Sequence, residues 1–283
     1  MVLITGILGQ LGYDLSKELT NRGVEFIAPS LEELELTTEA GAKNFILEKK
    51  PDVVAHCAAY TAVDKAESEQ ELALTVNGFG TRWVAEACRE IGAKMIYIST
   101  DCVFGGDGKI PYEIHDEKKP VNVYGRSKLL GEDAVTTILN KYFIVRTSWV
   151  FGINGNNFIK TMLRLAETKK SLRVVNDQIG SPTYTVDLAK LLADMAASDK
   201  YGIYHATNEG FCSWAEFAKE IFEKAGLNVE VEGIPTIEYP TPARRPFNSR
   251  LSKKSLDEAG FNRLPTWQDA LKRYLAELAR KNP

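Results

Sequence analysis

The sequence predicts an α/β protein built on a doubly wound parallel sheet, with a smaller C-terminal α/β lobe. Three observations indicate this class. Short apolar segments alternate with longer helical patterns in the first half of the chain, a glycine-rich turn follows the first apolar segment, and the alternation weakens after Ser148. A repeated strand–helix–strand order is typical of parallel sheets that carry helices on both faces.

The expected strands are short apolar runs without polar alternation, as in strands buried on both faces. They cover residues 2–5, 24–28, 52–58, 94–99, 142–145 and 202–206. The expected helices show apolar residues at helical spacing, as Leu11, Leu15 and Leu19 do, and they end at glycine or proline in several cases. They cover residues 9–22, 38–50, 69–91, 122–139, 185–197, 213–225 and 267–280.

Composition narrows the classes of function. The 283 residues include 44% hydrophobic and 26% charged residues, and the formal net charge is −3, as in ordinary globular proteins. No cluster of Lys and Arg occurs, which argues against nucleic-acid or membrane binding. The four cysteines form no C-x-x-C pair, so we expect free thiols and no metal site. The N-terminus does not resemble a signal peptide, and we expect a cytoplasmic protein.

The first turn carries a glycine motif, Gly6-x-x-Gly9-x-x-Gly12, between the first strand and the first helix. Glycines allow a tight turn and a close approach of the backbone to a pyrophosphate, and a helix N-terminus offers free N–H groups to it. The motif alone also fits a strand–helix turn without a ligand. Its position after the very first strand favours dinucleotide binding in a Rossmann-type domain.

The end of the second strand is the place where an acidic residue usually binds the ribose of NAD, or an arginine the phosphate of NADP. Here the chain reads Ala28-Pro29-Ser30, with neither residue type, and Glu32 and Glu33 lie beyond the expected position. The sequence therefore leaves NADPH and NADH both open as cofactors.

A Tyr–Lys pair begins the helix expected at 122–139. Tyr124 and Lys128 are four residues apart, so they share one helix face. A nearby ammonium is expected to lower the pKa of a tyrosine from its ordinary value of about 10, so that the tyrosine can act as an acid near neutral pH. Tyr13 and Lys17 have the same spacing, so the context decides: only Tyr124 follows a strand that ends in a hydroxyl residue, Thr100.

These motifs together resemble the extended short-chain dehydrogenases, and longer strings resemble one family among them, the dTDP-4-dehydrorhamnose reductases. The resemblance covers almost the whole chain. Two positions depart from the family pattern: Cys102 stands where an aromatic residue is common, and Glu35 where aspartate is expected. The matching strings are residues 58–67, 99–104, 123–128, 146–150, 155–158 and 242–251.

The resemblance implies a function: hydride transfer from NADPH or NADH to the 4-keto group of dTDP-4-dehydro-β-L-rhamnose, which yields dTDP-L-rhamnose for cell-surface polysaccharide. Tyr124 would donate the proton, Lys128 would bind the cofactor ribose and tune Tyr124, and Thr100 would hold the carbonyl. The implied catalytic residues are Thr100, Asp101, Tyr124 and Lys128. The implied cofactor-binding residues are Gly6, Gly9, Gln10, Leu11, Gly12, Ser30, Glu35, Leu36, Ala58, Ala59, Tyr60, Thr61, Tyr124 and Lys128. The implied substrate-binding residues are Val63, Thr100, Asp101, Trp149, Arg244 and Arg245.

Three of the substrate positions also have a simpler, structural interpretation. Arg244 and Arg245 are adjacent arginines, and a guanidinium matches a diphosphate well; they could equally anchor a proline-rich loop. Trp149 follows a strand end, where ligands bind in such sheets, but it could also fill core space.

Alternatives remain open. A sugar-nucleotide dehydratase would need an acid at the position of Cys102, and an epimerase would share the Tyr–Lys pair but keep its cofactor bound. A non-catalytic NADP-binding regulatory subunit would retain the fold. We expect a dinucleotide-binding domain at 1–148, with 185–197 and 202–206 packing back onto it, and a sugar-nucleotide lobe at 149–283. A nucleotide sugar is the expected partner, and a homodimer is the assembly to test.

Overall fold

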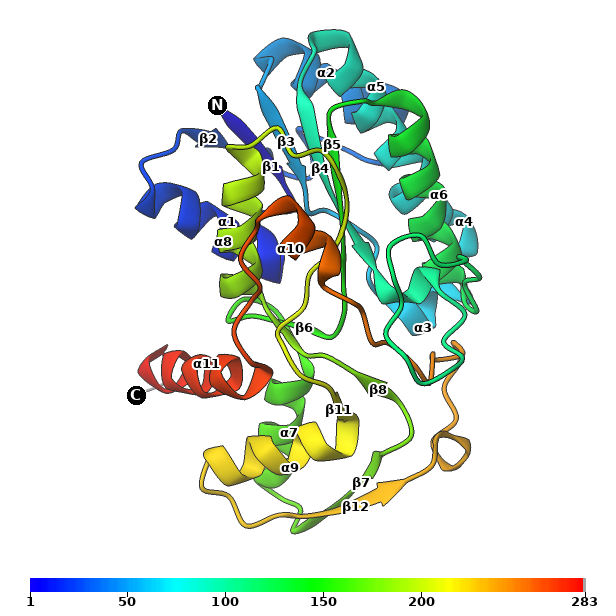
Figure 1. Cartoon of the computed structure of the whole chain (residues 1–283), viewed down its shortest axis with the longest axis vertical. Coiled ribbons are helices and arrows are strands. Elements are labelled where there is room, and N and C mark those ends of the chain that lie inside the picture. Colours follow the sequence, from blue (N-terminus) through cyan, green and yellow to red (C-terminus); the bar gives the residue numbers. More distant parts are fainter. Residues whose placement is uncertain (282–283) are drawn as a thin grey trace.

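The computed structural model describes residues 1–281, and within them a six-stranded sheet forms the centre of the larger part of the molecule (Figure 1). All of its strands are parallel, in the order β10-β5-β4-β3-β1-β2. The predicted fold class is confirmed. The strands are β1 (Val2–Thr5), β2 (Phe26–Ile27), β3 (Val53–His56), β4 (Lys94–Thr100), β5 (Tyr142–Thr147) and β10 (Gly202–His205).

Helices cover both faces of this sheet. Alternate residues of β1, such as Ile4 and Leu3, belong to two different apolar clusters. Each strand therefore buries both of its faces, which explains its continuous apolar sequence. One face packs against α1 (Gln10–Asn21) and α8 (Thr185–Ala196), and the other against α2 (Glu39–Lys49), α5 (Thr81–Ile91) and α6 (Val123–Ile138).

The prediction of one continuous helix over residues 69–91 is wrong, because the structure divides this range into separate elements. The structure has α3 (Val63–Ala66), α4 (Gln70–Leu74), a π-helical turn at Thr75–Gly80 and then α5. Gly78 allows the turn to approach α6, because a Cβ there would lie 2.4 Å from a methyl carbon of Leu130. Such turns often occur at functional sites, and the apolar spacing along the sequence does not reveal this one.

The second part of the chain forms a smaller α/β lobe below the sheet (Figure 1). Its apolar cluster includes Phe151, Phe217 and Tyr274. Three strand pairs complete it: β7 with β12 in parallel, β6 with β9 in parallel, and β8 with β11 antiparallel. The elements are β6 (Val150–Phe151), α7 (Phe158–Ala166), β7 (Ser171–Val175), β8 (Ile179–Gly180), β9 (Thr183–Tyr184), β11 (Cys212–Ser213), α9 (Trp214–Lys224), β12 (Glu230–Ile234) and α11 (Trp267–Lys281). Helix α10 (Lys254–Ala259) packs on the sheet domain instead, because Leu256 belongs to the apolar cluster that covers one face of the sheet.

The sequence did not indicate α7, β7, β12 or α10, because they are short and two of them are edge strands with exposed residues. It did indicate α8, which packs on the central sheet, and β10, which is a strand of that sheet. Both follow β6, the first strand of the lobe, in the chain. The division of the chain at residue 148 stays a prediction.

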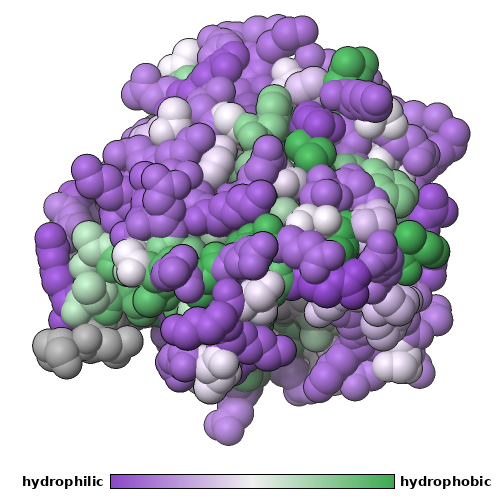
Figure 2. Space-filling model, turned by 90° about the horizontal axis from the view of Figure 1, so that it is seen from below, coloured by the Kyte–Doolittle hydropathy of each residue, from purple (hydrophilic) through white to green (hydrophobic). Residues whose placement is uncertain are grey.

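The surface of the lobe is mostly hydrophilic. Figure 2 shows this face from below, with hydrophobic residues in a narrow band rather than a broad patch. Among the helices of residues 1–281, none is long and apolar enough to span a membrane.

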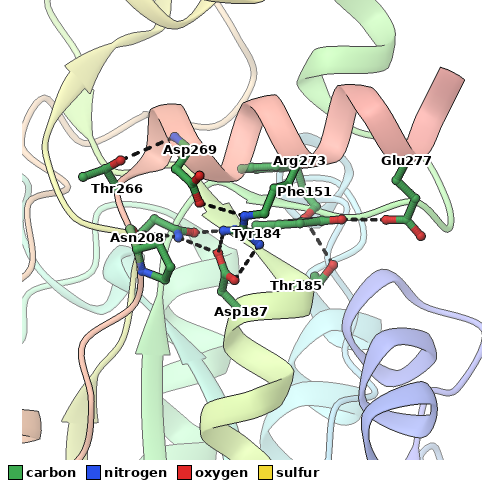
Figure 3. Close-up of polar contacts among 10 residues, drawn as sticks. Phe151, Tyr184, Thr185, Asp187, Asn208, Thr266, Asp269, Arg273 and Glu277 are labelled. Atoms are coloured by element: carbon green, nitrogen blue, oxygen red, sulfur yellow. Dashed lines mark hydrogen bonds and ion pairs between the residues drawn. The ribbon is translucent and has the colours of Figure 1, made fainter. Parts of the chain in front are cut away.

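An ion pair between a partly exposed arginine and a buried carboxylate joins α11 to α8 (Figure 3). Arg273 donates two hydrogen bonds to Asp187, at 2.8 Å to Oδ1 and 2.6 Å to Oδ2, and its guanidinium lies 5.3 Å from the centre of the Tyr184 ring. The side chain of Asp187 is 3% exposed and also accepts a hydrogen bond from Asn208. This network fixes the last helix against the sheet domain.

We expect Arg273→Ala to lower the free energy of unfolding by about 2–3 kcal/mol, because it leaves the Asp187 charge buried without its main partner. Arg263→Ala is the matched control. Arg263 pairs with Asp257, but both side chains are more than two-fifths exposed, so its loss should cost less than about 1 kcal/mol. Urea denaturation measures both; equal losses would contradict this role of Arg273.

Candidate active site

A large cleft of about 1870 Å³ opens at the carboxyl ends of the central strands and extends into the lobe. Thr5, Thr100 and Thr147, the last residues of β1, β4 and β5, all line it. Of the residues that the sequence indicated, those that line the cleft are Gly6, Gly9, Gln10, Leu11, Gly12, Ser30, Glu35, Leu36, Ala58, Ala59, Thr61, Val63, Thr100, Asp101, Tyr124, Lys128, Trp149 and Arg245. Tyr60 and Arg244 are not among the lining residues.

The glycine turn between β1 and α1 forms a cradle that side chains would fill. A Cβ on Gly12 would lie 2.4 Å from the carbonyl oxygen of Gly6, and a Cβ on Gly6 would lie 2.8 Å from the backbone nitrogen of Ala58. Gly9 precedes α1 without a side-chain cap, so N–H groups at the helix N-terminus face the cleft. These features fit a dinucleotide pyrophosphate.

The side chain of Gln10 links the glycine turn to the lobe. Its carboxamide oxygen accepts hydrogen bonds from Gly152 N at 2.8 Å and from Asn157 Nδ2 at 3.1 Å. Gln10 also lines the cleft, and its binding to a cofactor stays a prediction.

A second loop, residues 58–61, forms the neighbouring wall. Ala58 N donates to Thr5 Oγ1 at 3.0 Å. Asn77, in the π-helical turn, accepts from Tyr60 N at 2.8 Å and donates to Tyr60 O at 2.9 Å. Asn77 was not among the residues that the sequence indicated. The local signal that could have revealed it is the Asn-Gly pair inside a helical pattern, which is unusual in a helix interior.

The segment after β2 forms one wall of the cleft. Ser30 and Glu33 form two reciprocal hydrogen bonds. Ser30 N donates to Glu33 Oε2 at 2.8 Å, and Glu33 N donates to Ser30 Oγ at 3.2 Å. Glu35 accepts a hydrogen bond from the Thr37 hydroxyl. Leu36 is 8% exposed and supplies an apolar wall here.

The Tyr–Lys pair lies on the cleft face of α6. Asn122 caps this helix by accepting from Gly125 N at 2.7 Å. A Cβ on Gly125 would lie 2.1 Å from the carbonyl oxygen of Cys102. The absence of that atom lets α6 begin against the turn that follows β4, which places Tyr124 beside Thr100.

Burial dominates the electrostatics of this pair. It raises the pKa of Tyr124, while the Thr100 hydroxyl opposes the rise. It lowers the pKa of Lys128 to about 7, partly offset by Glu132. The expected lowering of the Tyr124 pKa is not seen, because burial, together with Cys102 and Asp101, raises it. A raised pKa keeps Tyr124 protonated at neutral pH, which suits a proton donor.

Thr100 and Asp101 face the same region. Thr100 Oγ1 donates to Asp101 Oδ1 at 2.9 Å and accepts from Cys102 N at 3.1 Å. Burial raises the pKa of Asp101, while hydrogen bonds from Ser249 and Thr100 oppose the rise. Ser249 also lines the cleft. It belongs to the matching string 242–251, but it was not predicted as a site residue.

Trp149 belongs to a stacked pair in the cleft. It has a positive φ of 48°, and its ring lies 3.6 Å from that of Trp214, centre to centre, with 13° between the planes. Gly180 makes room for it, since a Cβ there would lie 2.8 Å from the Trp149 ring. The core-filling alternative does not describe Trp149 fully, because the ring also lines the cleft.

The two adjacent arginines, Arg244 and Arg245, lie in different environments. Arg245 lines the cleft and donates from Nη2 to Asp64 Oδ2 at 2.8 Å, while its Nη1 is buried without a partner within the described residues. Arg244 is exposed, and its carbonyl oxygen accepts from Asn122. Within residues 1–281, no group of three or more His, Cys, Asp or Glu side chains is placed to hold a metal ion.

Comparisons with known proteins point to one family. The family model described as the RmlD substrate binding domain matches residues 1–280. A Bacillus subtilis relative, the spore coat polysaccharide biosynthesis protein SpsK, is 44% identical, with 98% of this chain and 97% of the relative covered.

Two solved structures resemble the chain closely. A dTDP-4-dehydrorhamnose reductase from Clostridium acetobutylicum is 43% identical, with a TM-score of 0.96 and 98% and 99% of the two chains covered. One from Bacillus anthracis, in complex with NADP, is 43% identical, with a TM-score of 0.95 and 98% of each chain covered.

Proposed function

This chain belongs to the dTDP-4-dehydrorhamnose reductase family, and from that premise we propose that it reduces the 4-keto group of dTDP-4-dehydro-β-L-rhamnose to dTDP-L-rhamnose with NADPH or NADH. One observation supports the chemistry most strongly. The close contact between the start of α6 and the turn after β4 brings Tyr124, Lys128 and Thr100 together at one wall of the cleft. The product serves polysaccharide biosynthesis, as the name of the Bacillus subtilis relative suggests.

When bound, NADPH or NADH would supply the hydride for C4 of the sugar. The glycine turn and the N-terminus of α1 would hold its pyrophosphate, with the loop at 58–61 beside it. Lys128 would bind its ribose. The lobe, with Trp149 and Arg245 at the cleft surface, binds the sugar nucleotide across from the cofactor.

The protein's own residues handle the proton. As negative charge develops on the C4 oxygen, Tyr124 donates its phenolic proton to that oxygen, and the protonated Lys128 stabilises the phenolate that remains. The Thr100 hydroxyl, which donates to Asp101 in the structure, turns to donate to the same oxygen. Solvent then returns a proton to Tyr124.

The pH dependence follows from Lys128. Because its pKa is lowered to about 7, the ammonium is present below that pH and is lost above it. We expect kcat/KM, which reports the free enzyme, to fall as the pH rises through about 7. In Lys128→Arg the guanidinium stays charged, so this decline should disappear while kcat is reduced. A decline of the same shape in both proteins would contradict the assignment.

The direct test is oxidation of NADPH and of NADH in the presence of dTDP-4-dehydro-L-rhamnose, with a UDP-linked 4-keto sugar as the comparison. Rapid oxidation with the dTDP sugar supports the reductase. An epimerase would change the sugar without consuming cofactor. A regulatory subunit would bind NADPH with no turnover. We place the reaction in the cytoplasm, where NADPH and nucleotide sugars are available, and a homodimer remains a prediction.

A further inference from the structure

A buried carboxylate lies one helical turn beyond Lys128, and the reaction described above does not use it. Glu132 is on α6, four residues after Lys128, and is 1% exposed. Its ion-pair partner, Arg146 on β5, is 0% exposed. Buried charges are costly unless they are paired and hydrogen-bonded, so this pair needs an explanation.

Three hydrogen bonds hold the carboxylate. Arg146 donates from Nε to Oε1 at 2.8 Å and from Nη2 to Oε2 at 2.7 Å, and Ser99 Oγ donates to Oε1 at 2.6 Å. Ser99 and Arg146 are register partners on β4 and β5. A single carboxylate on α6 therefore binds two adjacent strands, and the residue that follows Ser99 is Thr100.

The arginine is fixed on its other side as well. Arg146 Nη1 donates to the carbonyl oxygen of Ile114 at 2.9 Å and lies 3.3 Å from His205 Nε2. Burial lowers the pKa of His205 to about 3, so the ring is neutral and can accept this hydrogen bond. His205 is the register partner of Arg146 on β10. The ion pair therefore has little freedom to shift.

The same carboxylate acts on Lys128 through its charge. The negative charge of Glu132 raises the pKa of Lys128, against the larger effect of burial. The Lys128 ammonium lies 4.1 Å from the centre of the Tyr97 ring, and Tyr97 Oη donates to the Lys128 carbonyl oxygen at 3.1 Å. Helix α6 is thus held against β4 at Lys128 and again one turn later at Glu132.

We propose that Glu132 is a positioning residue for the reduction, which fixes Tyr124 and Lys128 on α6 relative to Thr100 on β4 and helps Lys128 keep its charge. The inference rests on the proposed function. A carboxylate that served stability alone would not affect the ionisation of Lys128 or the rate of the chemical step.

The test compares Glu132→Gln with Asp187→Asn. Both substitutions neutralise a buried carboxylate that accepts two hydrogen bonds from an arginine, but Asp187 binds α11 instead of the catalytic strands. We expect Glu132→Gln to lower kcat at least about tenfold and to move the decline of kcat/KM to lower pH by about half a unit or more. Asp187→Asn should be less stable than the wild type but should keep the wild-type kcat and the wild-type pH profile of kcat/KM. Wild-type kcat and pH profile in a folded Glu132→Gln protein would overturn the proposal.

Ser99→Ala separates position from charge, because it removes one hydrogen bond and leaves the carboxylate. We expect a several-fold lower kcat and an unmoved pH profile. If Glu132→Gln does not fold, Glu132→Asp replaces it. That variant keeps the charge but shortens the side chain, so it should lower kcat without moving the profile, and wild-type kcat in it would overturn the proposal.

A measurement without turnover completes the test. Nitrogen-15 lysine labelling and NMR titration, with Lys128→Arg to assign the signal, follow the ionisation of Lys128 directly. We expect a lower pKa for Lys128 in Glu132→Gln than in the wild type. If the wild type does not reduce the sugar, the proposed function fails, yet this titration still decides on Glu132. An unchanged Lys128 titration would overturn its electrostatic role.

Discussion

Replacing Tyr124 by Phe is expected to lower kcat for sugar reduction about 1000-fold, because the substitution removes the proton donor and leaves the ring in place. The raised pKa of Tyr124 means that the wild-type hydroxyl carries its proton at neutral pH. Among the described residues, the other tyrosine that lines the cleft is Tyr239, which is 58% exposed. NADPH binding should change little, so the effect should appear in kcat rather than in the cofactor Kd.

Tyr201→Phe is the matched control. Its hydroxyl donates to Asp199 at 2.7 Å, and its ring lies beside Phe143 near the amino end of β5, whereas the cleft opens at the carboxyl ends of the strands. Its removal should leave kcat at the wild-type value. Steady-state kinetics and NADPH titration measure both variants. A Tyr124→Phe protein that retains more than about one tenth of the wild-type kcat would exclude Tyr124 as the principal acid.

Replacing Gly6 by Ala is expected to raise the Kd for NADPH at least about 100-fold. The new Cβ would lie 2.8 Å from both the nitrogen and the Cα of Ala58, and these are backbone atoms that cannot turn away. The glycine turn and the loop at 58–61 would have to separate, and both line the cleft where we propose that the cofactor binds. A 100-fold loss corresponds to about 2.7 kcal/mol.

Gly92→Ala controls for backbone strain. Gly6 and Gly92 have similar positive φ values, 69° and 74°, but a Cβ on Gly92 would meet nothing within 4 Å. Both variants should lose about 1 kcal/mol of stability from the positive φ, and only Gly6→Ala should lose cofactor affinity. Fluorescence titration with NADPH gives both constants; equal affinities would show that the close approach to Ala58 is unimportant for binding.

The sequence was sufficient for the sheet domain because its signals are local. Apolar runs and helical spacing predicted each of the six strands and the helices that cover them. Local spacing could not rank the two Tyr–Lys pairs, however. The structure separates them by environment: the Lys17 side chain is 45% exposed and pairs with Glu277, whereas Lys128 is 2% exposed at the cleft.

The features that the sequence did not reveal depend on residues far apart in the chain. Arg245 pairs with Asp64 across 181 positions, and Ser99 meets Glu132 across 33. Strand β7 pairs in parallel with β12, which lies far along the chain. No periodicity or motif carries such information. The π-helical turn, in which Asn77 bonds the backbone of Tyr60, left only the Asn-Gly pair as a local signal.

The most direct test of the central claim is transfer of deuterium from NADPH labelled at C4 of the nicotinamide, in each stereochemical form, to dTDP-4-dehydro-L-rhamnose. If the chain is a reductase, one labelled form should yield dTDP-L-rhamnose with deuterium at C4 of the sugar, and one NADPH should be consumed for each product molecule. A sugar nucleotide recovered without deuterium, with the NADPH unchanged, would contradict the account.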